Sequence, residues 1–246
     1  MLASRRSGTP RTRKKELNIA PPASTLAIIP IHERTTAGVL TIGGRSVLDA
    51  TVRALRAVPA IGPIVLALEN VDPVLCLEAI PHPEDLQVIV TASLPDRWRA
   101  IAAALEIEPS LSTVLLHAPE RPLLTPASLN ALLDGLTGDG ALFGIPVHET
   151  IKRVVGGRIV ATVPRESLHV SQLPCAFRRA VVARATQRAI EQHWTCENEV
   201  QLARAAGIRL QLVSGQRFNL PITSALDARY AELRSSPQLE FVGAAS

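Results

Sequence analysis

Short apolar runs alternate with amphipathic segments along the first half of the chain. Four of these runs are rich in Leu, Ile and Val and predict buried strands: 26–30, 64–68, 86–91 and 113–116. Between and after them, apolar residues at helical spacing predict four helices: 47–58, 72–79, 96–105 and 125–136. Asp72 with Pro73, and Thr125 with Pro126, are typical of an N-cap followed by the first helical residue. This alternation predicts a mostly parallel sheet with helices on both faces, because parallel neighbours need helical crossovers.

The pattern changes in the second half. The segments 151–155 and 158–162 flank Gly156-Gly157, a two-residue loop that favours a tight hairpin because both glycines tolerate positive φ. A hairpin between helical repeats predicts an arm, about residues 147–172, that projects from the sheet. The remaining periodicity predicts two helices, a strand and a closing helix: 176–192, 197–206, 209–214 and 224–233.

Composition bounds the class of protein. The chain has 246 residues, 47% of them hydrophobic and 3% aromatic, which excludes a wholly disordered chain and argues against aromatic platforms for nucleic acid. Residues 1–24 hold six basic side chains against one glutamate. The whole chain has a net charge of +4, so the residues after 24 are together nearly neutral. We expect a disordered basic tail over 1–24, one domain over 25–234 and a C-terminal tail over 235–246. A solvated extension or a misplaced start codon explains the basic tail better than a nucleic-acid or membrane arm.

The sequence predicts a cytoplasmic protein with no membrane or nucleic-acid partner. No apolar run approaches the roughly 20 residues of a membrane span, and no apolar stretch directly follows the basic N-terminus as in a secretory signal. The three cysteines, Cys76, Cys175 and Cys196, are scattered and indicate neither a disulfide framework nor a zinc site. We expect Cys175 and Cys196 to be small buried apolar residues rather than nucleophiles.

Five short motifs follow one another along the chain: I-G-G-R-S-V-L (42–48), L-L-H-A-P-E-R-P (115–122), E-T-I-K (149–152), P-R-E-S-L (164–168) and N-L-P-I-T (219–223). Over about residues 26–234 they resemble the 2-C-methyl-D-erythritol 4-phosphate cytidylyltransferases of non-mevalonate isoprenoid synthesis. The resemblance implies an α/β, Rossmann-like three-layer nucleotidyltransferase fold with a projecting β-arm that interlocks a homodimer. It also implies that CTP and methylerythritol phosphate are joined, with Mg²⁺ assistance, and that pyrophosphate is released.

The resemblance further implies six site residues: Arg34 and Arg165 as catalytic, and Thr150, Arg121, Thr223 and Arg97 as substrate-binding. Thr150 and Arg165 match positions that hold the acceptor phosphate across the dimer. The residues themselves leave alternatives open: Arg34 as an ordinary surface arginine, Arg121 in a structural ion pair, and Arg97 as an exposed residue in the first turn of a helix.

The sequence departs from the family pattern where phosphate and metal are held. The segment P-I-H-E-R-T-T-A-G-V-L (30–40) is short and lacks the paired glycines that let backbone N–H groups converge on phosphate. Ala118 stands where the Mg²⁺-associated aspartate is expected, Pro221 stands where a lysine is expected, and no residue is assigned as a metal ligand. These departures keep a second hypothesis open: a non-catalytic dimeric paralogue that acts as a binding or regulatory protein.

Overall fold

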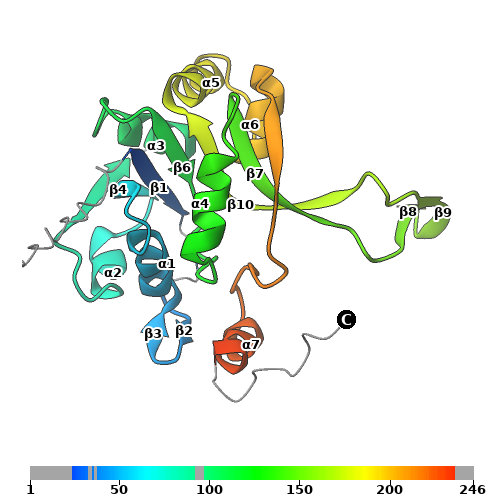
Figure 1. Ribbon diagram of the computed structural model, residues 1–246, viewed down its shortest axis with the longest axis horizontal. Coiled ribbons are helices and arrows are strands. Elements are labelled where there is room, and N and C mark those ends of the chain that lie inside the picture. The colour runs from blue at the N-terminus through cyan, green and yellow to red at the C-terminus, as the bar shows by residue number, and fades with distance from the viewer. Residues whose placement is uncertain (1–23, 33–34, 36–37, 92–96, 236–246) are drawn as a thin grey trace, which may run out of the picture.

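The computed structural model describes residues 24–32, 35, 38–91 and 97–235, which include a seven-stranded sheet between two helical layers (Figure 1). The strands of the sheet, in spatial order, are β11 (Leu210–Ser214), β7 (Gly140–Pro146), β10 (His169–Arg178), β6 (Thr113–Leu116), β1 (Thr25–His32), β4 (Ile61–Glu69) and β5 (Leu86–Thr91). Two separate ribbons pair β2 (Thr41–Ile42) with β3 (Arg45–Ser46), and β8 (Ile151–Val155) with β9 (Arg158–Val163). The helices are α1 (Val47–Arg56), α2 (Pro73–Glu78), α3 (Arg97–Leu105), α4 (Pro126–Asp134), α5 (Arg179–Glu191), α6 (Glu199–Ala206) and α7 (Ala225–Ser235).

The sheet is mostly parallel, as predicted. Strands β5, β4, β1 and β6 pair in parallel, β11 pairs in parallel with β7, and only β10 runs antiparallel to its neighbours β6 and β7. The strands predicted at 86–91 and 113–116 match β5 and β6 residue for residue. The predicted caps Asp72 and Thr125 begin α2 and α4, and each accepts a hydrogen bond from a backbone N–H in the first turn.

The helix predicted from residue 176 is wrong at its start. Residues 169–178 form β10, and α5 begins only at Arg179. Cys175, Ala176 and Phe177 are fully buried and pair with Leu116, Leu115 and Val114 of β6. A strand that passes directly into a helix has one continuous apolar pattern, so its boundary carries no turn residues to mark it. Strand β7, which pairs with β10, was not among the predicted strands.

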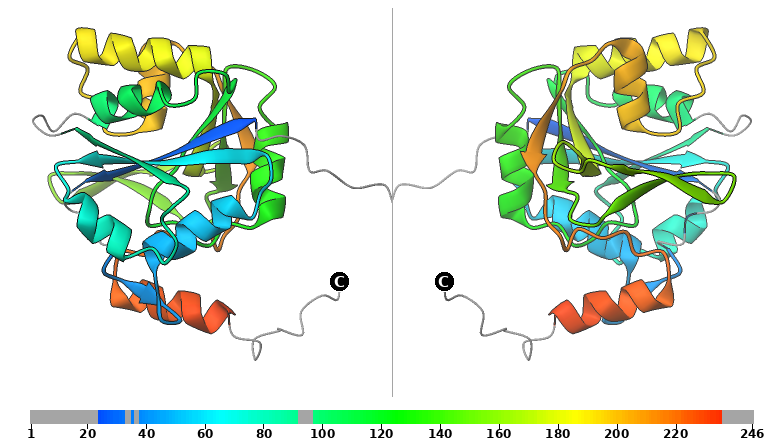
Figure 2. Two further views of the ribbon diagram at one scale, coloured as in Figure 1. Left: turned by 90° about the vertical axis from the view of Figure 1, so that its left-hand side faces the viewer. Right: turned by 90° about the vertical axis from the view of Figure 1, so that its right-hand side faces the viewer.

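Two apolar cores cover the two faces of the sheet, which confirms the three-layer α/β fold. Alternate residues of β1 point to opposite faces: Ala27 and Ile29 pack with α1, α2 and α4, whereas Leu26 and Ile28 pack with α3, α5 and α6. In Figure 2, α5 and α7 lie at opposite sides of the sheet. Helix α7 joins the first core and lies beside the β2–β3 ribbon, where the Gly43 N–H donates to Glu232 Oε1 at 3.0 Å.

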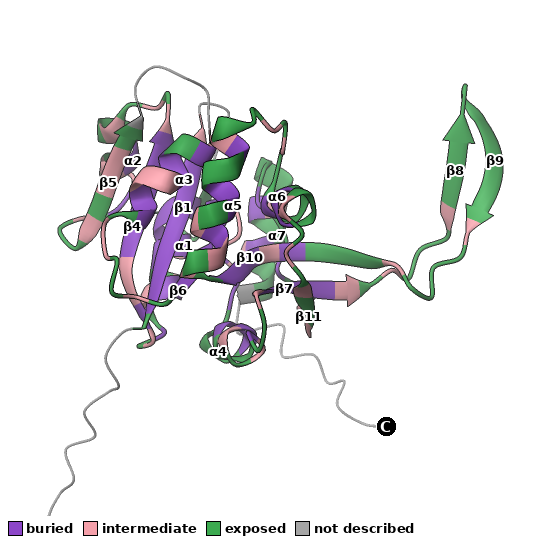
Figure 3. Ribbon diagram, turned by 90° about the horizontal axis from the view of Figure 1, so that it is seen from above, coloured by how far each residue is buried: buried purple, intermediate pink, exposed green. Residues whose placement is uncertain are grey.

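Strands β8 and β9 form the predicted arm. Gly156 and Gly157 have φ values of 54° and 76°, so both central residues of the turn occupy the left-handed region that this hairpin loop requires. The ribbon extends from the ends of β7 and β10, and most of its residues are exposed (Figures 1 and 3). Its exposed residues include four large apolar side chains: Val154, Val155, Ile159 and Val160.

No helix within the described ranges is both long and apolar enough to cross a membrane. The predicted tails lie outside the described residues, apart from Ser24 and Ser235 at their inner ends.

Candidate functional site

The loop after β6, residues 117–122, lies at the carboxyl end of a parallel strand, where open α/β sheets bind their ligands. His117 is fully buried, and its backbone N–H donates to the carbonyl oxygen of Ile28 in β1 at 3.0 Å. The pKa of His117 is lowered from 6.5 to about 3, mainly by burial and to a lesser extent by the charge of Arg121, while the hydrogen bond to the Arg121 carbonyl opposes the shift. The ring is therefore neutral at physiological pH, and its Nε2–H donates to the backbone carbonyl of Arg121 at 3.1 Å.

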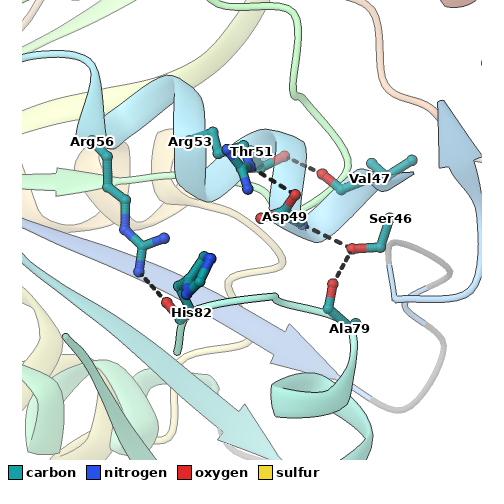
Figure 4. Close-up of polar contacts among 8 residues, drawn as sticks. All are labelled: Ser46, Val47, Asp49, Thr51, Arg53, Arg56, Ala79 and His82. Carbon is teal, nitrogen blue, oxygen red and sulfur yellow. Dashed lines mark hydrogen bonds and ion pairs between the residues drawn. The ribbon is translucent and has the colours of Figure 1, made fainter. Parts of the chain in front are cut away.

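Three further hydrogen bonds hold this loop from different elements. Thr51 of α1 places its hydroxyl oxygen 2.8 Å from the carbonyl oxygen of Pro119. The same hydroxyl oxygen lies 2.9 Å from the carbonyl oxygen of Val47 on its own helix (Figure 4). The backbone N–H of Ile222 donates to the carbonyl of Glu120 at 2.8 Å. The Arg121 guanidinium donates to the carbonyl of Asn219 at 2.5 Å. The loop is therefore fixed by β1, α1 and the segment before α7.

The start of α1 is anchored next to this loop. Ser46 caps the helix by accepting from the N–H of Asp49 at 2.9 Å, and its hydroxyl donates to the carbonyl of Ala79 after α2 at 2.5 Å (Figure 4). Asp49 is buried and pairs with Arg53 one turn later at 2.8 Å. This network fixes the helix that carries Thr51.

Arg121 retains donors for an anion. Its guanidinium is partly buried, burial lowers its pKa, and none of its hydrogen bonds or ion pairs in the described part of the chain is to a carboxylate. Arg121 thus forms no ion pair within these residues, although the charge of the neighbouring Glu120 raises its pKa against the effect of burial. A guanidinium has five N–H donors, so those not used on Asn219 can bind phosphate oxygens.

Thr223 caps α7. Its backbone N–H and its hydroxyl both donate to the Asp227 carboxylate, at 3.1 and 3.2 Å. Ser224 binds the same carboxylate with its N–H and hydroxyl, and these bonds, led by the Ser224 hydroxyl, lower the pKa of Asp227. Thr223 follows Ile222, which contacts the 117–122 loop, so the segment places it near Arg121. Its role as a substrate ligand stays a prediction.

Arg97 lies on the other face of the sheet, at the start of α3. Its guanidinium pairs with the Glu199 carboxylate of α6, whose side chain is only 1% exposed, and lies 5.9 Å from the Trp98 ring centre. Arg97 does lie in the first turn of α3, but the expected exposure is wrong, because its side chain is 23% exposed and engaged in this pair. Trp98 is buried. Nucleotide binding by Arg97 remains a prediction.

Thr150 and Arg165 both lie at the base of the arm and are exposed. Arg165 donates to the backbone carbonyl of His148, and its own carbonyl accepts from the N–H of Leu168 at 2.9 Å. The arm itself projects from the sheet (Figure 3). Arg34 lies outside the described residues.

Sequence reasoning missed the residues that hold the segment before α7. Gln172 of β10 is buried, donates to the Gln216 carbonyl at 2.8 Å and accepts from the Gln216 N–H at 3.1 Å. The buried Asn219 donates to the carbonyl of Leu173 at 2.8 Å. Asn219 belongs to the N-L-P-I-T motif, but the only available signal for Gln172 was a polar residue within an apolar run.

The loop offers a poor set of ligands for a metal. Ala118 has no side-chain oxygen, and Glu120 lies 3.4 Å from the Thr35 hydroxyl. Across the described ranges, no group of three or more His, Cys, Asp and Glu side chains could hold a metal ion. These residues do not fit a protein-bound Mg²⁺, which prefers several oxygen ligands.

The comparison with known proteins identifies the family. The family model for 2-C-methyl-D-erythritol 4-phosphate cytidylyltransferase, IspD, matches residues 32–234 of the sequence. The chain belongs to this family. An IspD relative from Acidobacterium capsulatum is 32% identical over 210 residues, which cover 80% of this chain and 87% of that protein. The Azoarcus IspD is 40% identical over 122 residues, 48% of this chain and 50% of that protein.

The IspD fold is confirmed by solved structures as well. The 4-diphosphocytidyl-2C-methyl-D-erythritol synthase from Anaerococcus prevotii matches with a TM-score of 0.73 at 19% identity, covering 87% of this chain and 98% of that one. The family resemblance stated from the five motifs is therefore confirmed.

Proposed function

We propose that this chain is a 2-C-methyl-D-erythritol 4-phosphate cytidylyltransferase. In this reaction, a phosphate oxygen of the acceptor attacks the α-phosphorus of CTP, a new P–O bond forms, and the bond to the β-phosphate breaks. Pyrophosphate leaves with the bonding electron pair. Such a reaction mainly requires alignment of the reactants and stabilisation of negative charge. Residues 25–234 would form the catalytic domain.

The observation that carries the proposal is the fixed 117–122 loop. It presents Arg121 at the carboxyl end of β6, and its main chain is held by Thr51, Ile222 and the neutral ring of His117. A cation whose position is set before the substrate binds stabilises a charged transition state without reorganising. Arg34 would add a second cation, and Arg97 and Thr223 would contact the nucleotide and the acceptor.

We assign Mg²⁺ to the nucleotide rather than to the protein. Magnesium is commonly bound through substrate phosphates and retains several waters. Such a complex would deliver the ion without a carboxylate at Ala118. The free thiols Cys76, Cys175 and Cys196 fit a reducing cytoplasm, where we place the protein.

The arm supports a homodimer in which Thr150 and Arg165 reach the partner's loop. Val155 and Ile159 are 63% and 68% exposed, and a second copy would bury them. Changing either to Asp is expected to yield monomers in analytical ultracentrifugation. The matched variant Leu75→Asp, at a position 64% exposed on α2, should remain dimeric. Unchanged dimers of both arm variants would refute this arrangement.

The activity is tested by pyrophosphate release from CTP, methylerythritol phosphate and Mg²⁺. Arg121→Ala is expected to lower kcat about a hundredfold, the usual cost of one charge-stabilising contact. Arg184→Ala removes an exposed arginine of α5 and should retain full activity. Binding of both substrates without turnover by the unaltered protein would refute catalysis and favour the non-catalytic paralogue.

A further inference from the structure

Two guanidinium groups contact one residue at the base of the arm. Arg165, in the turn after β9, donates to the backbone carbonyl of His148. Arg217, in the segment between β11 and α7, places Nη2 at 2.7 Å from His148 Nε2. A guanidinium can only donate, so the imidazole nitrogen facing Arg217 is the acceptor. His148 therefore brings together two cations from distant parts of the chain.

No described carboxylate neutralises either cation. Glu149 and Glu166 are exposed neighbours in the sequence, yet neither forms an ion pair with Arg165 or Arg217 within the residues described. The partners that both arginines do have are a backbone carbonyl and an imidazole nitrogen, neither of which is a carboxylate. The base of the arm thus holds two arginines with no carboxylate partner among the described residues.

Each guanidinium also retains most of its hydrogen-bond donors. A guanidinium has five N–H groups in a planar fork, a geometry that matches the oxygens of a phosphate group. Arg165 and Arg217 each use one nitrogen on His148. Thr150, two residues after His148 and exposed, adds a hydroxyl at the same end of the arm. These groups suit a dianionic phosphomonoester better than a singly charged carboxylate.

We propose that Arg217 is a further binding residue for the phosphate of the acceptor, acting beside Arg165. This inference rests on the proposed function for the identity of the acceptor. Arg217 comes from the segment that also carries Asn219 and Ile222, which hold the 117–122 loop. The segment between β11 and α7 therefore holds the 117–122 loop through its main chain and brings the charge of Arg217 to the base of the arm.

The experiment is a calorimetric titration of the full-length protein with methylerythritol phosphate and, separately, with inorganic phosphate. Loss of one charge-assisted contact is expected to weaken binding of both about tenfold in Arg217→Ala. Arg217→Lys should recover part of that loss, because the charge returns without the planar fork. Arg184→Ala is the matched control and should bind as the unaltered protein does. Because Arg217 is exposed, we expect the melting temperatures of all variants to agree closely.

The outcomes separate this inference from the proposed function. Weaker phosphate binding in Arg217→Ala supports the inference, even if the unaltered protein releases no pyrophosphate. Normal turnover combined with unchanged affinity and KM for the acceptor in Arg217→Ala overturns the inference and leaves the proposed function standing. Failure of the unaltered protein to bind either phosphate compound also overturns it.

Discussion

The ion pair between Arg97 and Glu199 allows a direct test of whether Arg97 supports the fold. Arg97→Ala would leave the Glu199 carboxylate, whose side chain is 1% exposed, without its cation. Removing one partner of a buried pair costs roughly 3–5 kcal/mol. Because the Arg97 side chain is 23% exposed, water can reach part of the vacated space, so we expect a smaller loss of about 2–3 kcal/mol.

Urea unfolding followed by circular dichroism measures this loss, and for a domain of this size the melting temperature should fall by roughly 5–10 °C. The double variant Arg97→Met with Glu199→Leu removes both charges and keeps apolar volume, so it should unfold within about 1 kcal/mol of the unaltered protein. An Arg97→Ala protein with unchanged stability would refute the reasoning, because the pair would then add nothing to the fold. A contact between Arg97 and the nucleotide is tested separately, by the CTP affinity of Arg97→Ala.

Three further predictions concern the loop after β6 and the arm. Thr51→Val removes the donor to the Pro119 carbonyl and should lower the free energy of unfolding in urea by about 1–2 kcal/mol. Thr51→Ser keeps the hydroxyl and should lower it clearly less. Equal losses in the two variants would contradict a role for the hydroxyl. The pKa of His117 is about 3 in the folded protein, against an ordinary value of 6.5. Below pH 6.5 the unfolded chain therefore binds a proton that the folded protein does not. The free energy of unfolding then falls as the pH drops, by up to about 1.4 kcal/mol per pH unit. His117→Gln should show a shallower pH dependence between pH 7 and 5, and identical slopes would argue against a buried neutral ring. Replacing Gly156 and Gly157 with Ala at φ values of 54° and 76° should cost roughly 1 kcal/mol each in thermal unfolding, and no loss would mean that the turn adopts another form.

Much of the fold follows from local pattern. The strands at 86–91 and 113–116 were predicted to the residue, and the caps at Asp72 and Thr125 begin helices as expected. Strand β10 was missed because it passes directly into α5, and Arg178 at that junction makes no side-chain cap. Local pattern thus finds elements that turn residues delimit, and misses boundaries that lie inside a continuous apolar run.

The candidate site was predicted less completely. The motifs indicated Arg121 and Thr223, but periodicity carries no signal for the pairing of Arg97 with Glu199, which lie 102 positions apart. The contacts of Gln172, Asn219 and Arg217 are also set by tertiary packing between distant segments. Sequence can propose which side chains carry the chemistry, whereas the partners that orient them emerge only once the chain is folded.

The bond from Arg121 to the carbonyl of Asn219 has a consequence for synthesis of the protein. The two residues are 98 positions apart, and the Glu120 carbonyl likewise accepts from the N–H of Ile222, a residue that is also made late. A ribosome that has made the first four strands of the sheet has therefore not yet made the segment that secures the loop beside them. Nascent or prematurely terminated chains will hold that loop only through β1 and α1, so the loop gains its last contacts only late in translation.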